Sequence, residues 1–343
     1  MTTSNIRNLL LQVLAFGLCA GLFSCKKDDD STETKNSLRG TLLFSIPAYV
    51  AAGDSFELVP TEVTTEEGTL AGIYWTFSHI SSPARDTVRY EGGIGDGLVT
   101  LEIPDTLTSM TITCTAFAEG YYNSTASAMV TVVNEETISG LGLPKNTPEF
   151  TDPRDGRTYP YVTVGTREWF ARNLSADGGF PYREAVAMQN VFGQYYSWEE
   201  AAVSCPDGWR LPDAEDWADL AAAAGTAETD AGMLAGVAGM LMADAYMNDR
   251  KMWEFYPEVK ITNDLLFSAI PTGYALDAEG KPSFAGIYEY AVFWTAEEDE
   301  EDAERAFCRQ LYVSSPDVFK AAMNKDSFRA PVRCVRDLQE KSE

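Results

Sequence analysis

The cysteine and histidine content of this chain sets the first limits on its chemistry. Six cysteines are spread along 343 residues, and the single histidine is His79. Ser-His-Asp and Cys-His catalysis use histidine as the general base, and histidine-based zinc sites need more than one imidazole. A lone histidine in a strand-like stretch therefore speaks against both kinds of site. We expect His79 to be a surface residue of a strand or loop.

The segment CPDGWRLPD, residues 205–213, is suited to either a catalytic turn or a structural corner. A helix is predicted before it, because Ser197 and Glu200 have the spacing of a capping box and apolar residues follow at helical intervals up to Cys205. Asp213 is a suitable N-cap for a second helix with the same apolar spacing. The prolines forbid one continuous helix, and no base stands beside a nucleophile. We therefore interpret the segment as a corner between two amphipathic helices.

The N-terminal residues indicate export and lipid attachment. Arg7 gives a positive start, an apolar run follows up to Leu22, and the sequence LFSC ends at Cys25. The run is too short for a transmembrane helix and resembles the signal peptide and lipobox of bacterial lipoproteins. The resemblance implies that residues 1–24 are removed and that Cys25 becomes the acylated N-terminus, with palmitate-like chains in the lipid bilayer.

A short charged cluster follows the predicted anchor. Residues 26–30 read KKDDD, which resembles the export signal that sends lipoproteins of Bacteroidota to the outer face of the outer membrane. We therefore predict a lipid-anchored outer-membrane protein that faces the cell exterior, with a periplasm-facing anchor as the alternative. Residues 25–38 are polar and should form an acidic tether.

The charge balance excludes some partners. Asp and Glu number 52 against 26 Lys and Arg, which gives a formal net charge of −26. So acidic a chain lacks the basic surface that nucleic acid requires and is not attracted to an anionic membrane. A hydrophobic content of 45% argues against a disordered chain, and the length suggests two domains.

Residues 39–134 are predicted to form a β-sandwich. Short runs rich in β-branched and aromatic residues alternate with turn residues, and about seven such strands are typical of an immunoglobulin-like domain. Trp75 and Cys114 alternate with apolar neighbours, so both should face the core, Cys114 as a free thiol. The segment resembles the immunoglobulin-like modules of bacterial surface proteins, which mostly act as spacers. Residues 135–150 have the composition of a linker.

Residues 151–338 carry five motifs in a recognisable order. They read DPRDGRTYPYVTVGTREWFARNL, YYSWEEAAVSCPDGWRLPDAEDWADL, LFSAIPTGY, VFWTAEE and VRCVRD. By these motifs the segment resembles the Fibrobacter succinogenes major paralogous domain family, whose fold is similar to C-type-lectin-like and formylglycine-generating-enzyme-like domains. The resemblance implies an α+β core closed by its first and last elements. The expected fold class is multidomain: an all-β immunoglobulin-like sandwich followed by an α+β C-type-lectin-like domain.

The same resemblance implies a structural disulfide. In C-type-lectin-like domains the cysteine that ends the first helix bonds to one in the final strand, which corresponds here to Cys205 and Cys334. A bond between Cys308 and Cys334 on neighbouring strands is the alternative. Chemistry like that of the related enzymes would need a reduced, copper-binding cysteine pair, for which Cys308 and Cys334 are the only candidates. We predict no cofactor, no metal and no catalytic residue.

The residues best suited to stack on a sugar are aromatic. The candidates for such a ligand surface are Trp253, Tyr274, Tyr288 and Tyr290. The acidic run at residues 297–304 lacks the spaced ligands and glycine turn of a formed calcium loop, so we expect a solvated loop. Residues 230–247 are rich in Ala, Gly and Met and are predicted to form a helix that covers the core.

These features predict a non-enzymatic surface lipoprotein with a binding or adhesion role. Its C-terminal domain would bind a glycan, a polypeptide or a neighbouring envelope protein. A structural or assembly component of the cell envelope or of a surface appendage is the first alternative. A copper-dependent, oxidase-like enzyme is the second.

Overall fold

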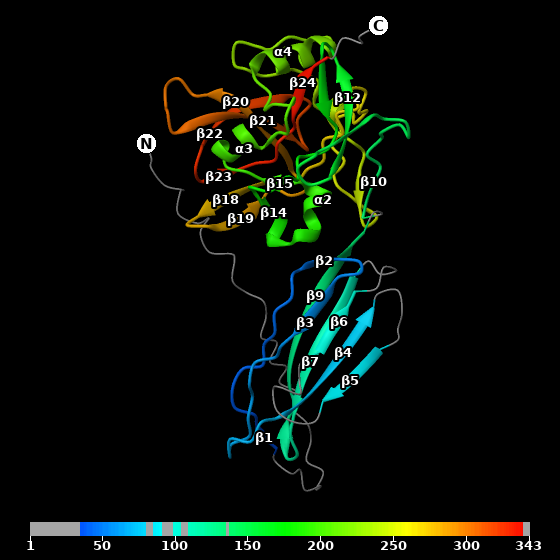
Figure 1. Ribbon diagram of the computed structural model, residues 1–343, viewed down its shortest axis with the longest axis vertical. Coiled ribbons are helices and arrows are strands. Elements are labelled where there is room, and N and C mark those ends of the chain that lie inside the picture. Colours follow the sequence, from blue (N-terminus) through cyan, green and yellow to red (C-terminus); the bar gives the residue numbers. More distant parts are fainter. Residues whose placement is uncertain (1–34, 80–84, 91–98, 104–108, 135–136, 339–343) are drawn as a thin grey trace, which may run out of the picture.

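The described part of the chain folds mainly into β-sheets, with 41% of its residues in strands and 11% in helices. The computed structural model describes residues 35–79, 85–90, 99–103, 109–134 and 137–338, with the backbone alone for 78–79, 85–90 and 99. Figure 1 shows an N-terminal region in blue and cyan and a C-terminal region in green to red. Within the described ranges, no helix is long and apolar enough to cross a membrane. The predicted signal peptide and Cys25 lie outside them.

The N-terminal region is built on a five-stranded sheet. Across the sheet its strands are β2 (Tyr49–Ala51), β9 (Ser124–Val133), β7 (Ser109–Phe117), β4 (Gly72–His79) and β5 (Arg85–Tyr90). Strand β2 is parallel to β9, and the other neighbouring strands are antiparallel. Two short pairs accompany this sheet, β3 (Ser55–Leu58) with β6 (Val99–Glu102) and β1 (Asn36–Ser37) with β8 (Tyr121–Tyr122).

An apolar core fills the space between these strands. Trp75 and Cys114 are fully buried and lie opposite each other on β4 and β7, as their alternation predicts. The ring of Phe44 packs edge-on against Trp75 with 5.0 Å between the centroids. The backbone of His79 ends β4, but its side chain lies outside the described part.

The segment between the two regions packs against the C-terminal region. Strand β10 (Ile138–Ser139) pairs antiparallel with β16 (Tyr246–Met247). The carbonyl oxygen of Leu141 accepts hydrogen bonds from the side chains of Asn263 and Ser268 at 3.0 and 2.8 Å. The segment predicted as a linker from its Gly, Pro and polar residues is therefore packed against the C-terminal region at residues 138–141.

Small sheets form the framework of the C-terminal region. One contains β11 (Glu149–Thr151), β12 (Thr158–Val164), β13 (Arg167–Phe170) and β24 (Val335–Asp337), and another contains β20 (Tyr290–Glu298), β21 (Arg305–Tyr312) and β22 (Val318–Asn324). Shorter groups are β19 (Lys281–Ala285) with β18 (Tyr274–Ala278) and β23 (Phe328–Arg329), β14 (Phe180–Pro181) with β15 (Gln194–Tyr195), and β16 with β17 (Arg250–Lys251). Because β24 pairs with β13, the first and last strands of this region share one sheet.

The two helices predicted around the corner are present. They are α3 (Trp198–Ser204) and α4 (Ala214–Ala223), and capping boxes at Ser197 and Asp213 open them. Each cap satisfies amides of the first turn that have no partner within the helix. Shorter helical turns are η1 (Tyr182–Glu184), η2 (Val186–Met188), α2 (Gln189–Phe192) and α5 (Ala238–Leu241).

The prediction of one helix over residues 230–247 is wrong. Within this range, α5 is helical and the remainder forms turns and short bridges. Gly232 has a φ of +76°, which a right-handed helix cannot include. At Gly239 a Cβ would lie 2.0 Å from the carbonyl oxygen of Lys260. Gly232 therefore interrupts a continuous helix, whereas Gly239 allows the short helix α5 to lie close to the backbone of Lys260.

Arg333 holds the end of the chain against the core. Its side chain is almost fully buried and donates to neutral oxygens at 2.6 to 3.1 Å. These are the Asn173 amide oxygen and the carbonyl oxygens of Phe170, Phe267 and Ser268. Burial, together with the like charge of Arg172, lowers the pKa of Arg333 to about 9, so the group stays protonated at neutral pH.

Replacing Arg333 by methionine should destabilise the C-terminal region by several kcal/mol. Each buried oxygen left without a donor costs about 1–3 kcal/mol. Arg333→Lys should also lower the free energy of unfolding, because one ammonium group cannot reproduce the planar set of donors of a guanidinium. Urea unfolding followed by tryptophan fluorescence measures the change. Arg305→Gln is the matched control, because Arg305 is exposed. An Arg333→Met midpoint equal to that of the control would refute this role.

Candidate functional site

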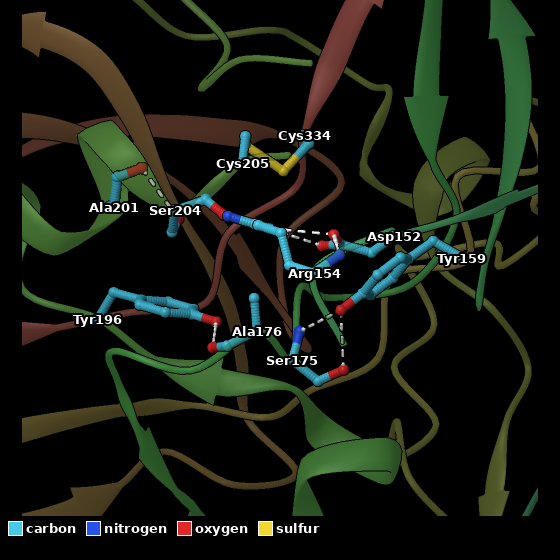
Figure 2. Close-up of a disulfide and its surroundings, with 10 residues drawn as sticks. All are labelled: Asp152, Arg154, Tyr159, Ser175, Ala176, Tyr196, Ala201, Ser204, Cys205 and Cys334. Carbon is cyan, nitrogen blue, oxygen red and sulfur yellow. Dashed lines mark hydrogen bonds and ion pairs between the residues drawn. A yellow bond between two sulfur atoms is a disulfide. The ribbon is translucent and has the colours of Figure 1, made fainter. Parts of the chain in front are cut away.

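The corner between α3 and α4 is covalently tied to the end of the chain. Figure 2 shows the disulfide between Cys205 and Cys334, whose Cα atoms are 5.8 Å apart. This is the pairing that the resemblance implied, and the alternative bond between Cys308 and Cys334 is absent from the described structure. The two bonded cysteines are separated by 129 positions in the sequence.

Other contacts around the disulfide occupy the polar and aromatic groups of the corner. The Trp209 ring packs 4.2 Å from Phe170 between centroids, and the guanidinium of Arg336 lies 4.2 Å from the Trp209 centroid. Arg154 forms an ion pair with buried Asp152 at 2.7 Å and also donates to a carbonyl of α3 (Figure 2). The hydrogen bonds from Arg154 hold the pKa of Asp152 below its usual value. The Asp152 carboxylate is therefore held in an ion pair, and the Cys205 sulfur is held in the disulfide.

The two remaining described cysteines are unreactive by environment. Cys114 and Cys308 are both buried, and burial raises the pKa of each thiol to about 12. A thiolate is the form that attacks or binds metal, so neither side chain is prepared for that chemistry at neutral pH. Cys334 is committed to the disulfide. The reduced pair of Cys308 and Cys334 that an oxidase-like reaction would need is therefore not formed.

The prediction of an aromatic ligand surface is wrong for one of its four residues. The other three do not form one continuous surface. Trp253 is fully buried, and its indole nitrogen donates to the Ala269 carbonyl oxygen at 3.1 Å. Tyr274 and Tyr290 are half-buried neighbours with 6.3 Å between ring centroids. Tyr288 belongs to a different apolar cluster and is covered by a guanidinium 4.0 Å from its ring centroid. The sequence shows which residues are aromatic but not which way their side chains point. Buried and exposed aromatic residues could therefore not be distinguished from the sequence.

The acidic run is used in ion pairs at the end of β20. Glu297 pairs with Lys320 at 2.6 Å, and Glu298 pairs with Lys325 at 2.5 Å. Within the described part of the chain, no group of His, Cys, Asp or Glu side chains is arranged to hold a metal ion. The charge of the run is thus partly neutralised by Lys320 of β22 and by Lys325 in the turn that follows it.

A polar pocket of about 370 Å³ opens between β12, the segment after β13, and α2. Its lining comes from three short stretches, which are Gly156 to Tyr159, then Arg172, Asn173 and Ser175, and finally Gln189 to Val191 with Gly193. This volume lies within the range of about 300–1,000 Å³ that is usual for small-molecule sites. Its lining includes no histidine, cysteine or carboxylate.

Hydrogen bonds fix several side chains of the pocket. The hydroxyl of Tyr159 lies 3.1 Å from Oγ of Ser175 (Figure 2). Burial raises the pKa of Tyr159, which keeps this hydroxyl neutral. Arg157 donates to Gln189 at 3.0 Å and pairs with Asp155 at 2.6 Å. The arrangement offers hydroxyl, amide and guanidinium groups in place of a nucleophile and its base.

Sequence reasoning missed this pocket. Its walls come from stretches that are separated by a strand hairpin and by turns, and none of them carries a motif for a binding site. The nearest signal is the DG turn at residues 155–156, which indicates a hairpin and says nothing of a ligand. A pocket assembled from ordinary polar residues becomes visible only when the chain has folded.

The protein is thus rich in β-strands, and a disulfide in its C-terminal region joins the corner after α3 to the end of the chain. The chain belongs to the Fibrobacter succinogenes major domain family, whose model matches residues 162–336. A search of the curated proteins found no match. Among solved structures, a superoxide reductase (neelaredoxin) from Ignicoccus hospitalis is 16% identical, with 30% of this chain and 86% of that chain covered and a TM-score of 0.22. A likeness this weak carries no argument about fold or activity.

Removing the disulfide should destabilise the C-terminal region without abolishing its sheets. For a loop of 129 residues, the double variant Cys205→Ser, Cys334→Ser should lose about 5 kcal/mol of unfolding free energy. Urea unfolding with and without reductant measures this loss. Reductant should lower the stability of the natural chain but leave the double variant unchanged. Equal stability of the two chains under oxidising conditions would contradict the prediction.

Proposed function

We propose that the protein is a lipid-anchored protein of the outer membrane, facing the cell exterior, whose C-terminal region binds a glycan without catalysis. Support for the anchor comes from the apolar N-terminal run, from Cys25 and from the charged cluster that follows it. In this proposal residues 39–134 form an immunoglobulin-like spacer. Residues 151–338 form a C-type-lectin-like head, and the membership of the described family supports that assignment.

The polar pocket is the observation that carries the binding role. Its walls carry the exposed amide of Asn190 and the buried hydroxyl groups of Ser175 and Tyr159, which bond to each other and keep further capacity to accept from a sugar hydroxyl. They lack a histidine, cysteine or carboxylate, which are the usual general bases, nucleophiles and metal ligands of enzymes. Binding therefore explains the chemistry of the pocket better than turnover does.

An assembly role in the cell envelope is the second candidate. The ring of Phe255 favours it, because this side chain is 81% exposed on a loop beside Tyr256, which is also exposed. A contact between proteins commonly centres on such aromatic residues. This role would use the loop and leave the pocket without a ligand.

Replacing Cys25 by alanine should release the protein from the membrane. Without acyl chains the protein lacks a stable bilayer attachment, since each buried methylene contributes about 0.8 kcal/mol. Metabolic labelling with a palmitate analogue should mark the natural chain and not the variant. Protease treatment of intact cells should digest the natural protein. An unlabelled natural chain would contradict the anchor, and a protected but labelled one would place it on the periplasmic face.

The natural chain should give signals on a glycan array, because the pocket can replace the water bound to sugar hydroxyl groups. Asn190→Trp should reduce these signals by filling the pocket opening. Phe255→Ala, which changes an exposed residue outside the pocket lining, is the matched control. If no glycan bound while a pull-down from envelope extract depended on Phe255, the assembly role would replace glycan binding.

A further inference from the structure

We propose that the pocket recognises an acidic saccharide residue, with Arg172 binding the anionic group of the sugar. This inference rests on the proposed glycan-binding function and adds the chemical class of the ligand. The hydroxyl groups of the same residue would contact the neutral side chains that line the pocket. A bidentate guanidinium suits a carboxylate, which makes a uronic-acid type of sugar the preferred ligand.

Among the arginines near the pocket mouth, Arg172 has no carboxylate partner within the described residues. It follows β13, lines the pocket and is exposed. Within the described residues, no carboxylate forms an ion pair with it, whereas Arg154, Arg157 and Arg167 all have carboxylate partners. A guanidinium that lies in a pocket and has no internal partner is available to a ligand.

Arg333 makes the surroundings of Arg172 more favourable to an anion. Arg333 is buried, and its hydrogen bonds go to an amide oxygen and to backbone carbonyl oxygens, none of which carries a charge. Burial and, after it, repulsion by the like charge of Arg172 lower the pKa of Arg333. A ligand carboxylate beside Arg172 would relieve this repulsion, an advantage that a neutral ligand lacks.

Arg157 has a different part in the pocket. Its guanidinium is paired with Asp155 at 2.6 Å and lies 3.7 Å from Asp177. These two carboxylates offset its charge. Arg157 would therefore orient a ligand through hydrogen bonds and would attract an anion only weakly. Arg172 is therefore the residue on which the preference for an acidic ligand depends.

The pocket also favours a sugar residue over a bare anion or a polyanion. Its volume of about 370 Å³ exceeds the space that an inorganic ion fills, and Ser175 and Asn190 line the same pocket as Arg172. A long polyanion would meet the field of a chain with a net charge of −26. Beyond about 8 Å that field is screened at physiological ionic strength, so one acidic residue can respond mainly to the local cation.

Isothermal titration calorimetry with the mature full-length chain in detergent tests the proposal. The probes are oligosaccharides of galacturonic and glucuronic acid, a sulfated oligosaccharide, the corresponding neutral oligosaccharides, and inorganic sulfate. We expect at least one uronic-acid probe to bind more tightly than its neutral counterpart. Arg172→Gln should weaken this binding by about 10- to 100-fold, the usual effect of losing a charge-assisted pair. Arg172→Lys should keep part of it.

Arg305→Gln is the matched control, because it removes the same charge from an exposed residue outside the pocket. Its affinity should equal that of the natural chain. Arg172→Gln should remain folded, since the residue is exposed and its loss relieves the repulsion on Arg333. Thermal unfolding of each variant verifies this expectation.

The outcomes separate this inference from the proposed function. If neutral oligosaccharides bind as tightly as acidic ones and Arg172→Gln has no effect, the acidic preference is refuted while glycan binding stands. A preference for the sulfated probe would replace the carboxylate by a sulfate ester. If inorganic sulfate binds as tightly as any saccharide, the pocket is an anion site and the saccharide is refuted. If no saccharide binds, glycan binding fails together with this inference.

Discussion

Two adjacent residues near the C-terminus hold the C-terminal region together. Cys334 is bonded to Cys205 at the end of α3, and Arg333 donates to the segment after β13 and to the loop at residues 267–268. Strand β24 has only three paired residues with β13, which alone is a short attachment. The covalent bond limits the unfolded chain, whereas the buried guanidinium satisfies backbone oxygens that would otherwise lack donors. The disulfide thus acts on the unfolded state and the guanidinium acts on the folded state, so both raise the free energy of unfolding.

The same constraint shapes the pocket. Asn173 accepts from Arg333 at 2.7 Å and donates to the Phe192 carbonyl oxygen at 2.8 Å, so both ends of its amide are fixed. Gly193 approaches so closely that a Cβ there would lie 2.6 Å from the Cβ of Asn173. One wall of the pocket is therefore held from behind by the scaffold. A site that is rigid before binding loses less conformational entropy when a ligand enters, which is an advantage for recognising a small sugar residue.

Local signals in the sequence were sufficient for some elements and not for others. The two capped helices were predictable because their capping residues and apolar spacing lie within a few residues of each other. Pairing Cys205 with Cys334 required a family resemblance, because spacing alone left a second pairing open. The helix predicted over residues 230–247 failed because composition does not reveal the positive φ angles of Gly232 and Gly236. Burial of Trp253 and assembly of the pocket depend on distant segments, which no local pattern records.

The junction between the two regions decides where movement can occur. The rings of Tyr49 and Tyr182 pack 5.5 Å apart, and Val133 shares an apolar cluster with residues of the C-terminal region. Strand β10 adds backbone hydrogen bonds to the same side of the junction. Apolar packing of this kind fixes the orientation of neighbouring units more firmly than a polar linker does. In the proposed surface protein, this packing would restrict the movement of the spacer relative to the head.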